Sequence, residues 1–314
     1  MALAYRSTAT IVAGTGTSVT GTEPSGTAQN DILIALYFVD QASATLGIPA
    51  GWSSIFNGAS STNFRYNLCY IVRGASAPSL AFTHTGSVYR ELHMLSFSGG
   101  DTNNPINASA DGGTFIGNPP NPDPPSATAT VANTLVLGVG IGWVGSQAGG
   151  WVAPSGYTIR TDNTPTDDGM IAVKSLASAT SENPGAFSGA FNTTADGWQA
   201  TVILAPQPIP TVSTDSVTSI ASTTATGNGT VSSDGGSTIT ERGVCWSTSA
   251  NPTTSNSKAT TSGTTGSYSA SLTGLTAGTT YHMRAYATNA NGTGYGGDYF
   301  FTTTYPTSTS WIKA

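Results

Sequence analysis

Short apolar runs alternate with clusters of Gly, Pro and Asn through the first 205 residues. Runs of four to nine residues that are rich in β-branched and aromatic side chains and bounded by turn residues are typical of β-strands. No apolar spacing of 3.6 residues is sustained anywhere in the chain, so helices are expected to be few and short. Six strands are predicted in this part: Asp31–Val39, Phe64–Val72, Tyr89–Phe97, Thr134–Gly142, Met170–Leu176 and Gln199–Ala205.

The same pattern occurs twice in residues 1–205. Each copy has an apolar strand, a Pro-x-Gly-aromatic turn, a second strand, a proline-containing turn with a downstream Phe, and a closing strand. Half of a β-sandwich cannot bury its own apolar face, so the copies are expected to pair around one core. The predicted fold is an all-β, jelly-roll-like β-sandwich. The matching segments are Asn30-Asp-Ile-Leu-Ile-Ala-Leu36 with Asn133-Thr-Leu-Val-Leu-Gly-Val139, Pro49-Ala-Gly-Trp52 with Pro154-Ser-Gly-Tyr157, and Phe82 with Phe187.

A proline-rich segment marks the boundary between two domains. Ala205-Pro-Gln-Pro-Ile-Pro-Thr211 has three alternating prolines, which remove backbone donors and favour an extended chain. A chain of 314 residues also exceeds what one hydrophobic core usually serves. The predicted organisation is an anchoring and assembly domain at 1–205, a linker at 206–210, a second domain at 211–304 and a C-terminal tail at 305–314.

The second domain, from about Thr211 to Thr304, resembles a fibronectin type III module of the variety found in bacterial surface proteins and tailed-phage virion proteins. The resemblance implies an immunoglobulin-like β-sandwich. It is carried by Thr238-Ile-Thr-Glu-Arg-Gly-Val-Cys-Trp-Ser247, Leu272-Thr-Gly-Leu-Thr-Ala-Gly-Thr-Thr-Tyr281, His282-Met-Arg-Ala-Tyr-Ala-Thr-Asn289 and Gly294-Tyr-Gly296 before Tyr299-Phe-Phe-Thr302.

The alternation of side chains in Tyr281–Ala287 agrees with that resemblance. A period of two places Tyr281, Met283, Ala285 and Ala287 on one face of a strand and His282, Arg284 and Tyr286 on the other. The spacing from Leu275 to Tyr281 resembles a tyrosine corner, in which the hydroxyl ties a loop back to the sheet.

The first domain resembles a Gly/Ser/Thr-rich sandwich of phage-encoded structural proteins. The shared features are an Asp followed by an apolar strand, the Pro-Ala-Gly-Trp turn, a tyrosine-rich strand, and the turn Ser98-Gly-Gly-Asp-Thr-Asn-Asn-Pro105. This resemblance implies a structural role in a virion.

Composition limits the partners. Charged residues are 8% of the chain and the net charge is -6, and the 10 Lys and Arg residues form no basic patch, so no nucleic-acid partner is expected. No apolar stretch is long enough to span a bilayer, and the N-terminus lacks the pattern of a signal peptide. No membrane partner is therefore expected, and folding in the cytoplasm is expected. Cys69 and Cys245 belong to different domains and are predicted to be buried free thiols.

The titratable residues do not form a recognisable catalytic pattern. There are three histidines, four glutamates and twelve aspartates. His84 is expected at a turn, His93 in a strand near Glu91, and His282 on the outer face of the second domain. Adjacent strands could bring His84, His93 and Glu91 together, but no nucleophile or metal pattern accompanies them, and structurally bonded or solvent-facing histidines are favoured. With no recognised enzyme motif, the chain is predicted to be a non-enzyme without catalytic residues or cofactor.

One acidic loop could in principle bind calcium. Asp162, Asp167 and Asp168 follow Tyr157 closely, and oxygen-rich loops can hold Ca²⁺. The spacing of an EF-hand is absent, so a solvated turn is favoured and no metal ligand is assigned.

Aromatic residues are the candidates for contact with a partner or ligand. Trp143 and Trp151 flank a glycine-rich loop, and they either pack on their own domain, which is favoured, or meet a partner. Trp311 and Ile312, in the tail beyond the second domain, either fray or dock.

These observations predict a non-enzymatic structural protein of a tailed-bacteriophage virion surface, assembled in the host cytoplasm. It would be a capsid decoration or head-fibre protein or a part of the tail fibre or tip. Its expected partners are capsid or tail proteins and further copies of itself, with a cell-surface glycan as an additional candidate. The alternative is a secreted carbohydrate-binding or adhesin-type accessory protein, and an enzyme with an unrecognised site comes third.

Overall fold

The computed structural model describes residues 3–59, 64–117, 122–142, 151–161, 169–188 and 195–306. The chain divides into two compact units, Ala2–Pro206 and Gln207–Ala314. The division falls inside the segment predicted to be a linker. All regular elements of the described residues are β-strands, in antiparallel sheets, which confirms the predicted all-β class. None of the described residues belongs to a helix that could cross a membrane.

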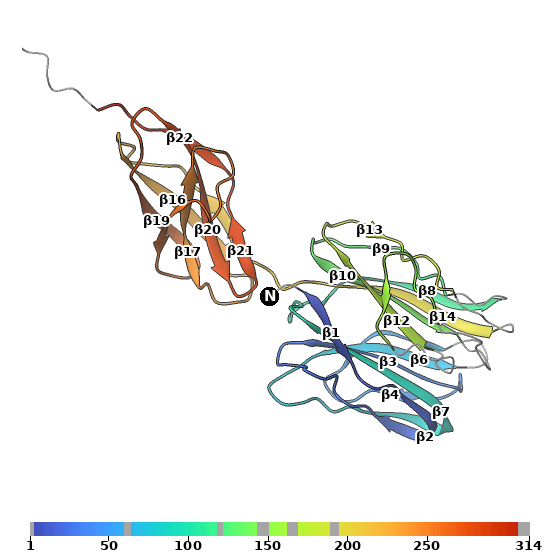
Figure 1. The fold of residues 1–314 in the computed structure, drawn as a ribbon. Helices are drawn as coiled ribbons and strands as arrows, with labels where there is room; N and C mark the ends of the chain where they lie inside the picture. The colour runs from blue at the N-terminus through green and yellow to red at the C-terminus, as the bar shows by residue number, and fades with distance from the viewer. Residues whose placement is uncertain are drawn as a thin grey trace, which may run out of the picture. The chain divides into compact units, whose positions relative to one another are not determined.

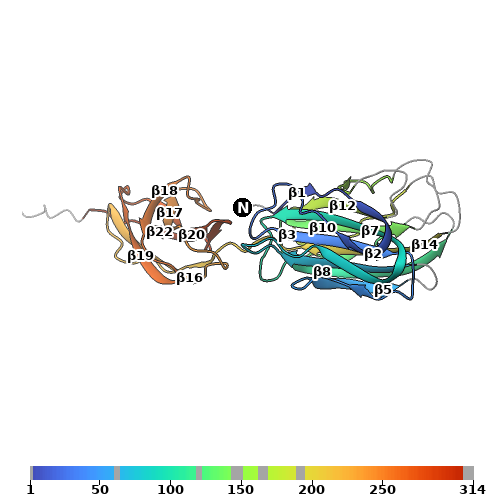
Figure 2. The same ribbon diagram turned by 90° about the horizontal axis from the view of Figure 1, so that it is seen from below.

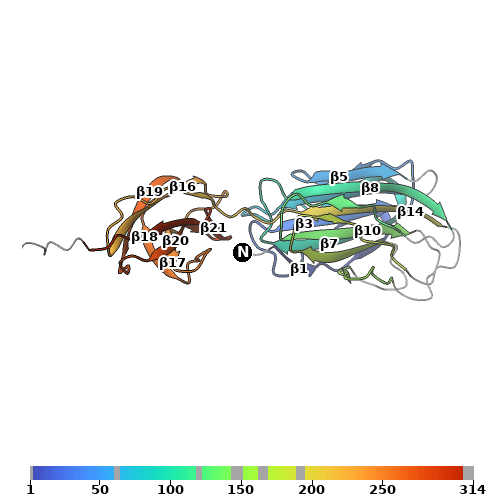
Figure 3. The ribbon, with the colours of Figure 1, turned by 90° about the horizontal axis from the view of Figure 1, so that it is seen from above.

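The first unit contains two large sheets that lie face to face (Figure 1). In Figures 2 and 3 the strands of both sheets run along a common direction. The first sheet contains β1 (Ala4–Thr8), β2 (Val12–Thr20), β3 (Ile32–Val39), β4 (Leu46–Gly47), β5 (Ser53–Ala59), β6 (Arg65–Val72) and β7 (Ala81–Ser98). The second contains β8 (Ile106–Gly117), β10 (Thr134–Gly142), β11 (Thr158–Ile159), β12 (Gly169–Leu176) and β14 (Ala195–Leu204), and a small separate sheet pairs β9 (Ala127–Thr128) with β13 (Ser181–Glu182).

The central strand of each sheet is buried on both faces. All eight residues of β3 and all nine of β10 are buried. Their alternate residues point into the core between the sheets, which includes Leu36 and Val139. The other residues, such as Tyr37 and Val136, belong to separate outer cores. Burial of both faces explains why these strands read as continuous apolar runs rather than as alternating ones.

The predicted duplication is present, and each copy forms one of the two sheets. β3 lies between β6 and β7 as β10 lies between β12 and β14. Asn30 and Asn133, which precede these central strands, both have positive φ, 71° and 58°, a conformation that asparagine tolerates better than most residues. Phe82 and Phe187 are both fully buried.

The pairing registers make the two sheets comparable residue by residue. Ile32 lies opposite Phe97 in the first sheet, and Leu135 lies opposite Leu204 in the second. Counting along the strands from these pairs, the positions of Glu91 and His93 in β7 correspond to those of Trp198 and Ala200 in β14.

The second unit is a β-sandwich of the fibronectin type III and immunoglobulin-like class. One sheet has the order β15-β16-β19, and the other has the order β18-β17-β20-β21, with β22 also paired to β20 (Figure 1). The strands are β15 (Thr211–Thr214), β16 (Thr224–Ser233), β17 (Glu241–Ser247), β18 (Ser257–Thr261), β19 (Gly266–Thr273), β20 (Thr280–Asn289), β21 (Gly292–Tyr295) and β22 (Tyr299–Thr302).

Two predictions for the second unit are confirmed. Met283, Ala285 and Ala287 point into its core, and Tyr281 packs against that core. The hydroxyl of Tyr281 accepts a hydrogen bond of 3.1 Å from the amide of Thr276. This contact ties the loop before β20 to the sheet, as the tyrosine corner requires.

Hydrogen bonds attach both ends of the proline-rich segment to the neighbouring unit. Pro208 is exposed, but its carbonyl accepts hydrogen bonds from Nδ2 of Asn289 (3.2 Å) and Nδ2 of Asn291 (3.1 Å). On the other side, the amide of Ala205 donates to the carbonyl of Pro105 (2.9 Å). Ala205 is therefore bonded to the first unit and Pro208 to the second, and Gln207 lies between these two attachments in the chain.

Limited proteolysis is expected to cut within Ala205–Thr211 and to release two folded pieces, because the boundary between independent cores exposes backbone. Mass spectrometry of the fragments locates the cut, and circular dichroism of each purified fragment reports whether it stays folded. Fragments that unfold on separation would contradict two independent units.

Candidate functional site

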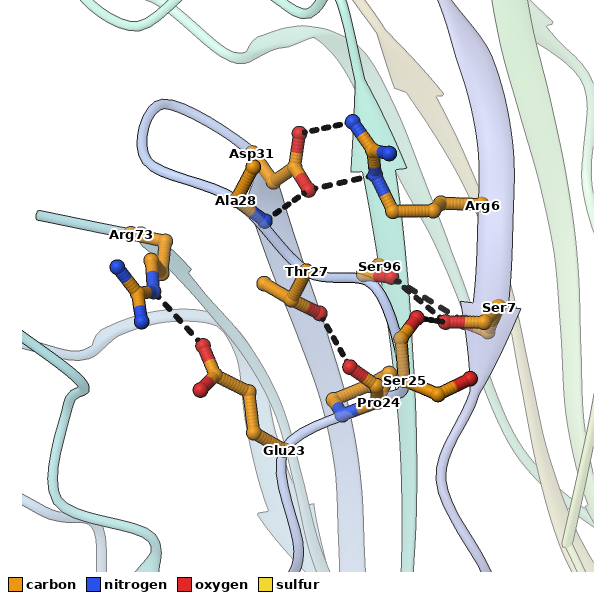
Figure 4. Close-up of polar contacts among 10 residues, drawn as sticks. All are labelled: Arg6, Ser7, Glu23, Pro24, Ser25, Thr27, Ala28, Asp31, Arg73 and Ser96. Atoms are coloured by element: carbon orange, nitrogen blue, oxygen red, sulfur yellow. Dashed lines mark hydrogen bonds and ion pairs between the residues drawn. The ribbon is translucent and has the colours of Figure 1, made fainter.

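A polar cluster fastens the N-terminal strand of the first unit (Figure 4). Arg6 in β1 contacts both carboxylate oxygens of Asp31, at 2.7 Å from Nε and 3.1 Å from Nη2, and the amide of Ala28 donates to Oδ2 at 2.8 Å. Arg73 and Glu23 form a neighbouring pair at 2.8 Å. The buried Asp31 carboxylate thus has three donors, as a buried charge requires. The ion pair of Arg6 and Asp31 joins β1 to the segment that precedes β3, and the pair of Arg73 and Glu23 joins the ends of two further strands.

His84 lies inside β7, where it pairs with Leu46, and not at a turn as predicted. Its Nε2 is 2.7 Å from the carbonyl of Gly16, and its Nδ1 is 2.6 Å from the Tyr37 hydroxyl. A carbonyl only accepts, so Nε2 carries the proton and Nδ1 accepts from Tyr37. Burial lowers the pKa of His84 and raises the pKa of Tyr37 to about 12. Both effects favour the neutral forms of this hydrogen-bonded pair.

His93 and Glu91 meet in the core between the two sheets. Nε2 of His93 is 2.5 Å from Oε1 of Glu91, and both side chains are 0% exposed. The ring of Phe38 stacks on the imidazole, with centroids 6.1 Å apart. A Cβ placed on Gly169 would lie 2.9 Å from Nε2, so the pair is closely packed. Nδ1 of His93 is buried without a hydrogen-bond partner.

His84 therefore lies apart from Glu91 and His93, although the sequence left open that neighbouring strands bring these three side chains together. Glu91 and His93 face the core between the sheets, where Leu95 and Phe97 of the same strand also lie. His84 contacts Tyr37, which belongs to the outer core. Among the described residues, no group of three or more His, Cys, Asp and Glu side chains is arranged to hold a metal ion. Asp162, Asp167 and Asp168 lie outside the described residues.

Trp151 is a core residue, which corrects its place among the contact candidates. Its exposed fraction is 2%, and its ring meets the edge of Phe187 with centroids 6.4 Å apart. The outer core of the second sheet covers the indole, so the alternative that it packs on its own domain holds. The other three candidates, Trp143, Trp311 and Ile312, lie outside the described residues.

The fluorescence that Trp151→Phe removes from the otherwise unchanged chain is expected to be blue-shifted and weakly quenched by acrylamide, because the Trp151 side chain is 2% exposed. Trp143→Phe provides the comparison. Quenching of Trp151 as strong as that of free tryptophan would contradict its place in the core.

The thiols are buried and free, as predicted. Cys69 and Cys245 form no disulfide. Burial raises the pKa of the Cys69 thiol, and burial likewise raises the pKa of Cys245 to about 11. Both sulfurs are thereby kept in the protonated form, which is a poor nucleophile and metal ligand.

Three aromatic residues among the described part of the second unit are exposed, namely Tyr299, Phe300 and Tyr305, and Phe300 is the one that faces outward beside a histidine–carboxylate pair. Phe300 in β22 is 71% exposed and lies directly opposite His282 in β20. The two rings have centroids 6.3 Å apart. Nδ1 of His282 is 2.7 Å from Oδ2 of Asp298, in a pair whose side chains are 25% and 23% exposed. The sequence pattern placed His282 outward, but neither Phe300 nor Asp298 was singled out.

Comparisons with known proteins give little guidance on function. No protein-family model matches the sequence, and no curated protein matches it. Among solved structures, the FN1–FN3 domains of chicken CNTN1 are similar at 15% sequence identity, with a TM-score of 0.25, covering 95% of this chain and 99% of that one. At that TM-score the fold assignment depends on the strand order and packing described above.

Proposed function

We propose that this chain is a non-enzymatic structural protein on the surface of a tailed-bacteriophage virion, as a capsid decoration, head-fibre or tail-fibre component. In this proposal residues 1–205 anchor the chain to other virion proteins, in many copies. The second unit is presented to the surroundings and aids attachment to the host surface. Assembly takes place in the host cytoplasm.

The observation that carries the non-enzymatic part is the burial of Glu91 and His93 at 0% exposure and of His84 at 7%. A general acid or base must reach the proton that it transfers, within hydrogen-bond distance of a substrate atom. These side chains instead bond to each other or to neighbouring strands. Their arrangement supports a role in the fold.

The virion part is supported by the two resemblances in the sequence and by the character of the surface. A protein displayed in many copies needs a surface that resists unwanted association. Only six large apolar residues among those described are exposed, and they are Val131, Val152, Ile209, Tyr299, Phe300 and Tyr305. A surface covered instead by Thr, Ser and Gly offers no large apolar patch for nonspecific contact.

The test uses particles purified from the phage that encodes the chain. Mass spectrometry should detect the full chain in particles separated on a density gradient. A phage whose gene lacks the codons for Thr211–Ala314 should still incorporate the shortened chain, because the anchor lies in residues 1–205. Incorporation that requires Thr211–Ala314 would place the anchor in the second unit or its tail. A chain found in the medium and absent from particles would favour the secreted accessory protein.

A further inference from the structure

The outward face of β20 and β22 in the second unit combines an exposed ring with polar groups at its edge. Phe300 and His282 are opposed across the two strands, and both point away from the core that contains Phe301 and Met283. Thr280 and Thr302 form the next opposed pair on the same face, with hydroxyls 2.9 Å apart.

Phe300 is not needed to build the sandwich. Side chains alternate between the two faces of a strand, and in β22 the inward position is filled by Phe301, which is 5% exposed. The outward neighbours of Phe300 on this face are threonine and histidine. A phenylalanine that is 71% exposed at an outward strand position therefore adds apolar area that the core does not use.

Three polar side chains beside this ring keep hydrogen-bonding capacity for a ligand. His282 uses Nδ1 to contact Oδ2 of Asp298, and within the described part of the chain Nε2 of His282 and Oδ1 of Asp298 have no partner. Arg284, two residues further along β20 on the same face, donates from Nε to the carbonyl of Gly296 at 2.8 Å. Its terminal nitrogens have no partner among the described residues.

The positions of these groups are fixed by the sheet. The guanidinium of Arg284 lies over the ring of Tyr295, 4.7 Å from its centroid. Outward residues two apart on a strand are separated by about 7 Å. His282 therefore lies at a corner, with Phe300 across the strand pair and Arg284 along β20, and one or two linked sugar rings would cover this area.

We propose that this face, which consists of Phe300, His282, Asp298 and Arg284, binds a pyranose-containing glycan. The C–H groups on one face of a pyranose ring carry partial positive charge and match the negative face of the phenylalanine ring. Its hydroxyls both donate and accept, so they fit the carboxylate, the imidazole and the guanidinium. Single-stranded nucleic acid would also stack on the ring, but the net charge of -6 opposes a phosphate backbone.

This site would give the second unit a ligand on the host surface. Only that biological setting rests on the proposed function, since the chemistry of the site does not depend on it. One ring and a few hydrogen bonds support weak binding, so affinity on a particle would come from many copies acting together.

The test measures binding of the full chain to immobilised polysaccharides, with neutral and acidic polymers in separate arms. Wild-type protein should bind at least one polymer. Phe300→Ser should weaken that binding more than about tenfold, as removal of a central aromatic anchor does. His282→Ala should weaken it as well, and Phe300→Tyr should retain it because the ring is kept. Tyr305→Ser is the matched control, since Tyr305 is 77% exposed and lies outside the site.

The proposal is overturned if no polymer binds, or if Phe300→Ser binds as well as wild type at an unchanged melting temperature. Equal losses from Phe300→Ser and Tyr305→Ser would show nonspecific apolar adhesion, and binding of single-stranded nucleic acid alone would name a different ligand. Phe300→Ser should still incorporate into particles. A wild-type chain that is absent from particles but binds glycans through Phe300 would refute the virion role and leave the site standing.

Discussion

His93→Leu alone is expected to lower the free energy of unfolding of the first unit by about 1–3 kcal/mol, the usual cost of removing one partner of a buried hydrogen bond. The substitution removes the imidazole that contacts the Glu91 carboxylate, and Glu91 is 0% exposed. A carboxyl group that loses a hydrogen-bond partner in a closely packed core keeps its desolvation cost without the bond that offset it.

The double variant Glu91→Met/His93→Leu is expected to recover most of that loss. Replacing a buried pair with apolar residues of similar volume is often neutral or stabilising. The second sheet supports this expectation, because its equivalent positions hold Trp198 and Ala200, both fully buried. Side chains without a carboxyl or imidazole group are therefore compatible with this place in the sheet.

Chemical denaturation of the wild type, the single variant and the double variant measures the three free energies. His282→Leu is the matched control, because its histidine–carboxylate pair lies at the surface, where such pairs contribute about 0–1 kcal/mol. A His93→Leu variant as stable as wild type would mean that the buried contact contributes nothing. A double variant whose free energy of unfolding is no higher than that of the single variant would mean that the site requires polar groups.

Trp198→Ala is expected to lower the stability of the first unit by about 3–5 kcal/mol. The indole is fully buried, stacks on Tyr66 with centroids 4.2 Å apart, and donates from Nε1 to Oδ1 of Asp111 at 2.8 Å. Truncation leaves a cavity between the sheets and removes one of the two donors to Oδ1 of Asp111, the other being the amide of Gly113.

Calorimetry of the full chain should show this loss in one of two transitions and leave the other unchanged, because each unit has its own core. Trp246→Ala, in the core of the second unit, is the matched control and should lower the other transition. A single transition that both substitutions lower together would contradict the independence of the two units.

The sequence was most informative where an element is buried on both faces. The run Thr134–Gly142 was predicted residue for residue, and Ile32–Val39 within one residue, because continuous apolar runs between turn residues leave little ambiguity. The start of β7 was missed, since the predicted strand began at Tyr89 whereas β7 begins at Ala81. In its first part, Ala81–Tyr89, the buried His84 stands between the exposed Thr83 and Thr85, and its burial depends on Tyr37 and Gly16 from elsewhere in the chain.

Side-chain surroundings were harder to predict than strands. The two-residue spacing of Glu91 and His93 places them on one face of a strand, but only the packing of the second sheet shows that this face is a core. Trp151 follows a glycine-rich loop, and its burial depends on Phe187, 36 positions later in the sequence. For Phe300, the signal was available in Tyr299-Phe-Phe-Thr302, because consecutive aromatic residues in a strand must face opposite sides.

Cryo-electron microscopy of purified particles, with and without antibody fragments raised against residues 211–304, tests the central claim most directly. The account predicts density for the double-sheet body of residues 1–205 in contact with a capsid or tail protein, and antibody fragments bound to the second unit. Particles that carry neither this density nor the antibody label, or particles that hold the chain through residues 211–314 with the first unit unattached, would contradict it.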